Sequence, residues 1–293
     1  MSLLQYDFMI RALVGALVIG VTAPAIGIYL VQRRMSLIGD GVGHVALTGV
    51  GVGLLLNRSP VITAVVAAAL GAILVELIRE RGRTPGDMAL ALLFYGGIAG
   101  GVLLVGLSGG SSTALTSYLF GALATTSGSD LVTIAVLGAA VLATMLVLRP
   151  ALFAICHDEE YARVSGLPVR ALNLLLAVAT AVTVTISMRA VGLLLISALM
   201  VVPVATAQQL ARGFRSTMAA AMGLGLLSAA AGMWIAATVD TAPGATIVVL
   251  AIGAFLLVAL GRGVLRAARR TAAESAVTPE PPEVAVGRMS GTE

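Results

Sequence analysis

The sequence predicts an all-α fold, a polytopic transmembrane bundle of eight or nine spanning helices, and three observations support it. Hydrophobic residues make up 59% of the 293 residues and charged residues only 11%, whereas charged residues make up about 25% of soluble domains. The mean hydropathy is +1.04. The apolar residues fall in long runs separated by arginines and turn residues, and a spanning helix needs about 20 such residues.

Nine apolar runs are candidate spans. They cover residues 9–31, 35–56, 60–78, 86–107, 129–148, 170–188, 190–210, 216–237 and 243–261. The runs do not alternate in polarity and are longer than barrel strands, which have about ten residues, so helices are favoured. Almost no loop separates 170–188 from 190–210, and a re-entrant segment there would reduce the count to eight. The 34 glycines favour close helix packing.

The distribution of arginine predicts the orientation of the chain. All 18 basic residues are arginines, and with nine spans 15 of them lie on one side, leaving Arg11, Arg58 and Arg189 on the other. Basic residues are enriched in cytoplasmic loops, so we expect a multi-pass protein of the plasma or inner membrane with a cytoplasmic C-terminus. With eight spans and the same C-terminal side, the N-terminus would also lie on the cytoplasmic side. This interfacial role of arginine explains the basic composition without a nucleic-acid partner.

Two regions are expected along the chain. Residues 1–265 form the transmembrane domain, with a cytoplasmic segment near 150–170, and residues 266–293 form a cytoplasmic, disordered tail that is polar and rich in proline. The first span has no basic n-region or clear cleavage site, which indicates a retained helix. No GxxxxGK[ST] loop occurs, so any ATP must bind another chain. One cysteine excludes a disulfide framework and a cysteine-based zinc site.

Two ionisable side chains lie inside the second expected span. Asp40 and His44 belong to Ser36-Leu-Ile-Gly-Asp-Gly-Val-Gly-His and, being four residues apart, share one helix face. Ionisable groups within a span are costly and indicate function. Carboxylate and imidazole suit zinc, manganese and iron, and a symmetric dimer would bring four such ligands together. The alternatives are a structural Asp–His hydrogen bond and a proton relay.

The longest polar stretch between spans, near residues 150–170, predicts a short surface helix. Asp158 and Glu159 suit its beginning, and Gly166 followed by Pro168 suits its end. We expect about eight residues of helix lying along the cytoplasmic membrane surface.

Two other polar features do not predict a site. Gly106-Leu-Ser-Gly matches the GxSG motif of rhomboid-type proteases, but a serine nucleophile needs a base within reach. His157 lies outside the spans, and His44 precedes the motif, whereas that family's base comes from a later helix. We therefore expect no catalytic residues and no enzyme. Glu76, beside Arg79, is expected to form an interfacial ion pair.

Three blocks, in order, resemble the permease subunits of ABC importers for manganese, zinc and iron. The first runs from Arg34-Met-Ser-Leu-Ile-Gly-Asp to His44 and on to Val50, and it is similar to that family's R-M-S-L-x-G-D-x-x-S-H. The second is Ser117-Tyr-Leu-Phe-Gly, followed by Asp130. The third runs from residues 158–168 to 190–207. The matches extend over most of residues 5–265.

The resemblance implies a homodimeric channel in the lipid bilayer, a cytoplasmic ABC ATPase dimer and an extracytoplasmic metal-binding protein. The chain itself would bind no cofactor, because ATP belongs to the partner subunit and Zn²⁺, Mn²⁺ or Fe²⁺ is the transported ion. The family's intramembrane pair falls on Asp40 and His44, and its ATPase-coupling loop falls on Asp158, Glu159, Glu160, Ala162 and Gly166. Gly43 and Thr48 depart from the family pattern, so metal selectivity does not carry over.

Two other transport classes remain open. A proton-coupled secondary carrier would use Asp40 and His44 as its relay and would need no ATPase. A siderophore or cobalamin permease would not need a His–Asp pair in its pathway. The three blocks favour the metal permease.

Overall fold

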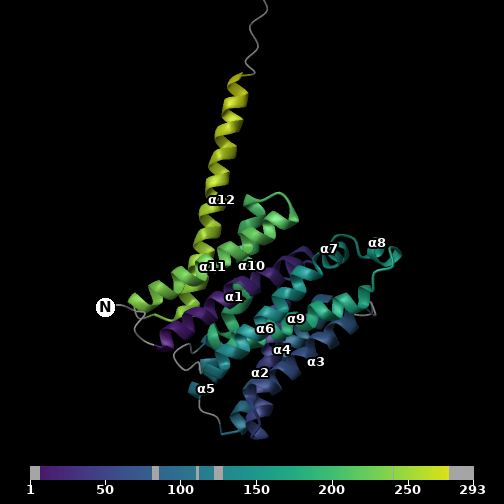
Figure 1. Ribbon diagram of the computed structural model, residues 1–293, viewed down its shortest axis with the longest axis vertical. Coiled ribbons are helices and arrows are strands. Elements are labelled where there is room, and N and C mark those ends of the chain that lie inside the picture. The colour runs from purple at the N-terminus through teal and green to yellow at the C-terminus, as the bar shows by residue number, and fades with distance from the viewer. Residues whose placement is uncertain (1–6, 81–85, 110–111, 122–127, 240, 277–293) are drawn as a thin grey trace, which may run out of the picture.

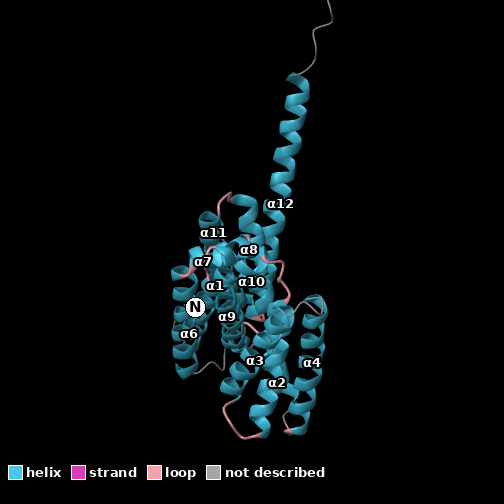
Figure 2. Cartoon of the chain, turned by 90° about the vertical axis from the view of Figure 1, so that its right-hand side faces the viewer, coloured by secondary structure: helices cyan, strands magenta, loops and turns pink. Residues whose placement is uncertain are grey.

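The computed structural model describes residues 7–80, 86–109, 112–121, 128–239 and 241–276, and these form a helical bundle without strands (Figures 1 and 2). The helices are α1 (Asp7–Gln32), α2 (Ile38–Leu55), α3 (Pro60–Glu80), α4 (Gly86–Leu107), α5 (Ser112–Phe120), α6 (Gly128–Val147), α7 (Arg149–His157), α8 (Glu159–Val164), α9 (Val169–Ala190), α10 (Leu193–Leu210), α11 (Phe214–Val239) and α12 (Pro243–Ala276). The predicted all-α fold is confirmed.

Eight helices in the described part of the chain are long and apolar enough to cross a membrane: α1, α2, α3, α4, α6, α9, α11 and α12. Each corresponds to an expected span. The ninth expected span, 190–210, contains a shorter apolar helix over Leu195–Leu210. The helical structure is interrupted between α9 and α10 at Gly192, whose φ of +96° lies in the left-handed region that favours glycine.

Helix α10 nevertheless runs between the two ends of the bundle. Figure 1 places α7 and α8 at one end and α5, with the beginning of α12, at the other. Near its beginning, α10 adjoins Gly244 of α12, which packs against Val191 and Leu195. Just beyond its end, Phe214 lies 4.8 Å, centroid to centroid, from the Phe153 ring of α7. Its 18 residues cover about 27 Å, so α10 traverses the bundle rather than turning back.

The interior of the bundle is built around α1, α2 and α9. In α1 and in α9, 72% of the most apolar stretch of the helix is buried, whereas the value is 22% in each of α4, α6 and α12. Small residues allow the inner helices to approach closely: Gly20 of α1 packs against the backbone of Gly225 in α11. The outer helices expose apolar side chains instead. On α3, Ile62, Val66 and Leu70 form one exposed face, as expected for contact with lipid or another chain.

Two segments differ from the sequence prediction. A short helix, α5, lies between the expected spans 86–107 and 129–148, and the backbone of its last residue, Phe120, packs against Gly192. Helix α12 continues to Ala276, past the expected domain end at residue 265. Its last residues are rich in alanine and arginine, which are good helix formers. The rest of the expected tail, 277–293, lies outside the described residues.

Candidate metal site and coupling segment

Helix α2 directs Asp40 and His44 towards α4. The His44 side chain is buried, and its ring forms a T-shaped contact with Phe94, with 4.5 Å between the ring centroids. One turn further on, the Thr48 hydroxyl donates a hydrogen bond of 2.8 Å to the Gly97 carbonyl. The predicted shared face therefore exists, and it lies along the seam between two helices of the same chain.

Glycines allow α2 and α4 to come this close. A Cβ atom at Gly97 would lie 2.6 Å from the carbonyl carbon of His44, a distance that real Cβ atoms do not adopt. A Cβ atom at Gly101 would lie 2.8 Å from the Leu47 side chain. Direct contact of the α4 backbone with α2 thus fixes the position of His44 in the seam.

Asp40 opens onto a cavity of about 370 Å³ at the first turn of α2. The cavity is lined by Leu37, Asp40, Leu90, Ala91, Phe94 and Tyr95. Leu37 and Tyr95 are 65% and 70% exposed, so the cavity faces the outside of this chain. A negatively charged carboxylate beside apolar and aromatic side chains attracts a cation.

His44 retains a free ring nitrogen. Nδ1 is buried and has no hydrogen-bond partner, and no hydrogen bond joins His44 to Asp40 in the part of the chain that the structure describes. A buried, unsatisfied nitrogen is uncommon in proteins and often marks a functional site. This geometry counts against the structural Asp–His hydrogen bond, and it leaves an imidazole nitrogen available to an ion.

One chain does not complete a metal site. Among the described residues, no group of three or more His, Cys, Asp or Glu side chains is placed to hold an ion. Asp40 and His44 therefore supply at most two side-chain ligands, whereas a closed tetrahedral zinc site needs four. A second copy is the simplest source of the other two.

The polar segment near residues 150–170 contains two helices where the sequence predicted one. Helix α7 precedes α8, and Asp158 lies between them as the α8 N-cap, its Oδ1 accepting the Tyr161 N–H at 2.9 Å. Gly166 ends the segment with a φ of +81°. The Leu167 N–H then bonds the Ala162 carbonyl at 3.1 Å, which closes the last turn. The beginning and end of α8 are as predicted, although it has six residues.

The two faces of α8 differ in exposure. Ala162 is fully buried, and Glu159 is turned partly inward. Glu160 is exposed, and Tyr161 and Val164 are 68% and 84% exposed. An aromatic and an aliphatic side chain presented together on an exposed helix are typical of a protein contact surface.

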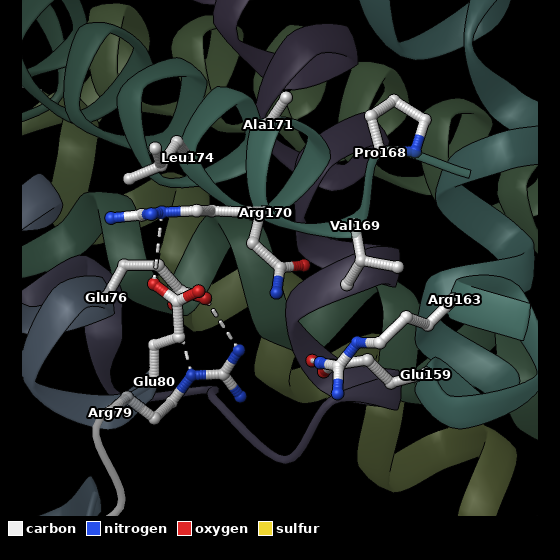
Figure 3. Close-up of a pocket in the computed structure, with 11 residues that line it drawn as sticks. Glu76, Arg79, Glu80, Glu159, Arg163, Pro168, Val169, Arg170, Ala171 and Leu174 are labelled. Carbon is white, nitrogen blue, oxygen red and sulfur yellow. Dashed lines mark hydrogen bonds and ion pairs between the residues drawn. The ribbon is translucent and has the colours of Figure 1, made fainter. Parts of the chain in front are cut away.

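A network of ion pairs surrounds this end of the bundle. A pocket of about 940 Å³ lies where α8, α9 and the end of α3 meet, and Figure 3 shows residues that line it. Arg79 donates two hydrogen bonds to Glu76, at 3.1 and 2.7 Å, so the predicted ion pair is confirmed. Arg170 pairs with Glu80 at 3.2 Å. The Glu76–Arg79 pair lies within α3, and the Glu80–Arg170 pair joins α3 to α9.

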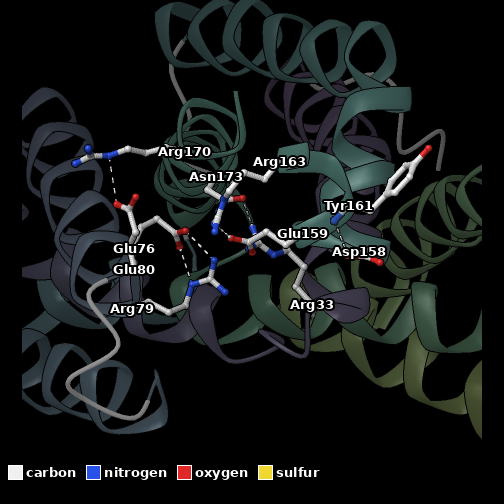
Figure 4. Close-up of polar contacts among 10 residues, drawn as sticks. All are labelled: Arg33, Glu76, Arg79, Glu80, Asp158, Glu159, Tyr161, Arg163, Arg170 and Asn173. Atoms are coloured by element: carbon white, nitrogen blue, oxygen red, sulfur yellow. Dashed lines mark hydrogen bonds and ion pairs between the residues drawn. The ribbon is translucent and has the colours of Figure 1, made fainter. Parts of the chain in front are cut away.

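The sequence did not predict the role of Arg33 and Asn173. Arg33 donates 2.7 and 3.0 Å hydrogen bonds to Asn173 and Glu159 (Figure 4). Burial lowers the pKa of the Arg33 guanidinium, and the nearby charge of Arg79 lowers it further. The only sequence signals were an arginine pair at the end of a span and an asparagine within one.

Cys156 offers a test of packing at this end. Burial raises the pKa of its thiol to about 11, and the thiol donates a weak hydrogen bond, 3.8 Å from Sγ, to the Tyr29 carbonyl. Since the thiolate is the nucleophile, we expect almost no maleimide labelling at pH 7.5 in the native protein and full labelling after denaturation. Rapid labelling of folded protein, followed by mass spectrometry, would contradict this packing.

A bundle of spanning helices with an ionisable pair inside one span is typical of membrane transport proteins. The chain belongs to the ABC 3 transport family, whose model matches residues 5–262. Members of this family are membrane permeases of ABC transporters, and ATP is hydrolysed by a separate subunit, so this chain is not itself an enzyme.

Individual relatives agree with this assignment. The chain is 30% identical to the high-affinity zinc uptake system membrane protein ZnuB of Haemophilus influenzae, over 86% of this chain and 97% of that protein. It is 33% identical to the manganese import system permease protein ScaB of Streptococcus parasanguinis, over 87% and 91%. The solved structure of PsaBC from Streptococcus pneumoniae in complex with Fab superposes with a TM-score of 0.78 and 32% identity, over 87% and 92%.

Proposed function

We propose that this chain is the permease of an ATP-driven importer of divalent metal ions, and that Asp40 and His44 line the ion's path. The observation that carries this proposal is the free Nδ1 of buried His44, one helical turn from a carboxylate that opens onto a cavity. Relatives named for zinc and for manganese are about equally similar to it. Zinc, manganese and iron therefore all remain substrates to test.

The functional unit contains two copies of this chain. The Asp40 cavity faces outward, so a second copy can approach it and contribute its own carboxylate and imidazole. Together the two chains supply four protein ligands. The family supports an ATPase and a substrate-binding protein as further partners.

The end that carries α7 and α8 faces the cytoplasm. Arginine is concentrated there, at Arg33, Arg34, Arg79, Arg149, Arg163, Arg170, Arg212 and Arg215, as the positive-inside tendency requires. Helix α12 begins at the opposite end of the bundle (Figure 1), and the arginines that follow its apolar part, Arg262, Arg266, Arg269 and Arg270, support a cytoplasmic C-terminus. The ATPase dimer docks on the exposed face of α8 through Glu160, Tyr161 and Val164, and the metal-binding protein docks at the opposite end.

The ionisable pair attracts and partly dehydrates the ion. The Asp40 carboxylate is half-buried in a span, and a divalent ion gains free energy by approaching its negative charge. The neutral imidazole of His44 donates a nitrogen lone pair, which replaces a water ligand. Binding must also stay weak enough for release of the ion to the cytoplasm.

ATP dependence separates this proposal from a secondary carrier. In proteoliposomes that contain the permease, its ATPase and its binding protein, we expect uptake of one of zinc, manganese or iron(II) that requires ATP. The control is the same complex with a catalytically inactive ATPase. Uptake that continues in the control would favour proton coupling through Asp40 and His44, and no uptake of any of the three metals would refute metal import.

A further inference from the structure

One buried arginine connects the coupling helix to the membrane bundle. Arg33 follows directly after α1, and its guanidinium bonds Glu159 of α8 with one nitrogen and Asn173 of α9 with another (Figure 4). The Arg33 side chain is 5% exposed, whereas that of Glu159 is 38% exposed. A single side chain thus joins three helices at the end of the bundle where α8 lies.

Helix α8 has few other links to the bundle. It packs mainly against α7. The second ion pair of Glu159, to Arg163 at 3.3 Å, stays within α8. In the described part of the chain, Arg33–Glu159 is the one side-chain hydrogen bond or ion pair that joins α8 to the rest of the bundle. The polar connection of α8 therefore depends on Arg33.

A short, hydrogen-bonded turn leads from Arg33 to α2, the helix that carries Asp40. Arg34 has a left-handed φ of +58°. The Met35 N–H bonds the Leu30 carbonyl at 2.8 Å, and the Ile38 N–H bonds the Met35 carbonyl at 3.1 Å. Asp40 lies in the first turn of the helix that follows. Because these hydrogen bonds constrain the turn, a displacement of Arg33 moves the beginning of α2.

We propose that Arg33 is a positioning residue that transmits movement of α8 to α9 and to the helix carrying Asp40. A buried guanidinium that loses one of two fixed partners is left with an unpaired charge, so α8 and the bundle move together rather than separate. Lysine at this position would keep the positive charge but would lose the guanidinium group, whose two terminal nitrogens bond Asn173 and Glu159. The inference rests on the proposed function and names a residue through which ATP-driven movement reaches the site.

The test compares Arg33→Ala with Arg163→Ala in the complete reconstituted complex. Both variants remove a cationic partner of Glu159, but Arg163 is 68% exposed and its pair stays within α8. We expect Arg33→Ala to assemble with the ATPase and to hydrolyse ATP, while zinc, manganese or iron(II) uptake per ATP falls about tenfold. Arg163→Ala should stay within about twofold of wild type, because exposed pairs contribute little.

Charge reversal separates positioning from general stability. Arg33→Glu and Glu159→Arg should each uncouple transport, and the double variant should regain much of the uptake per ATP, since Asn173 can donate to a carboxylate as readily as it accepts. A merely structural role would lower the amount of assembled complex but leave uptake per ATP unchanged. That result, or normal coupling in Arg33→Ala, overturns the inference. Absence of ATP-driven uptake in the wild type would instead refute the proposed function.

Discussion

Replacing Asp40 by asparagine or His44 by alanine is expected to lower ATP-dependent metal uptake by at least about tenfold, the lower range seen when groups supporting a metal site are removed. The asparagine would keep the shape of the Asp40 side chain but not the charge that attracts a divalent ion. The alanine would remove the His44 ring, whose buried Nδ1 has no partner in the chain. Uptake of zinc, manganese and iron(II) should be measured with each variant at matched membrane levels.

Glu80→Gln is the matched control for the loss of a carboxylate. Glu80 ends α3 and pairs with Arg170 at 3.2 Å, and both side chains are largely exposed. Its loss should change uptake by less than about twofold, because exposed ion pairs contribute little. If Asp40→Asn and His44→Ala both transport as well as this control, the two residues are structural and the metal path lies elsewhere.

The spanning helices were predictable because each is a long apolar run bounded by arginines or turn residues. The ends of α8 were also predictable, since Asp158 and Gly166 act through local backbone chemistry. The separate helix α7 and the short helix α5 were not predicted, because tertiary contacts decide such short elements. The break at Gly192 reflects the approach of the α5 backbone, which no local pattern reveals.

The candidate site was predictable in composition but not in arrangement. Spacing alone placed Asp40 and His44 on one face, but it could not indicate that this face lies against α4. The link from Arg33 to Glu159 and Asn173 joins residues more than a hundred positions apart. A single sequence does not show such pairing, whereas a buried arginine in a bundle must find partners somewhere.

Gly97→Ala should impair transport through packing alone. The added Cβ would lie 2.6 Å from the carbonyl carbon of His44 and 2.7 Å from the Val45 nitrogen. These are backbone atoms that no side-chain rotation can move aside, so α4 must shift away from α2. We expect a loss of stability of about 1–3 kcal/mol, typical of overpacking. The shift also separates Phe94 and the cavity from Asp40, so uptake per assembled complex should fall several-fold.

Gly96→Ala is the control that isolates this effect. The same helix gains the same methyl group one residue away, but a Cβ atom at Gly96 meets nothing within 4 Å. Alanine has a higher helix propensity than glycine, so this variant should be at least as stable as wild type and should transport normally. Thermal unfolding in detergent and metal uptake in proteoliposomes measure both properties. If the two variants have equal thermal stability and equal uptake, α2 and α4 do not meet at Gly97, and the contact proposed to position His44 is wrong.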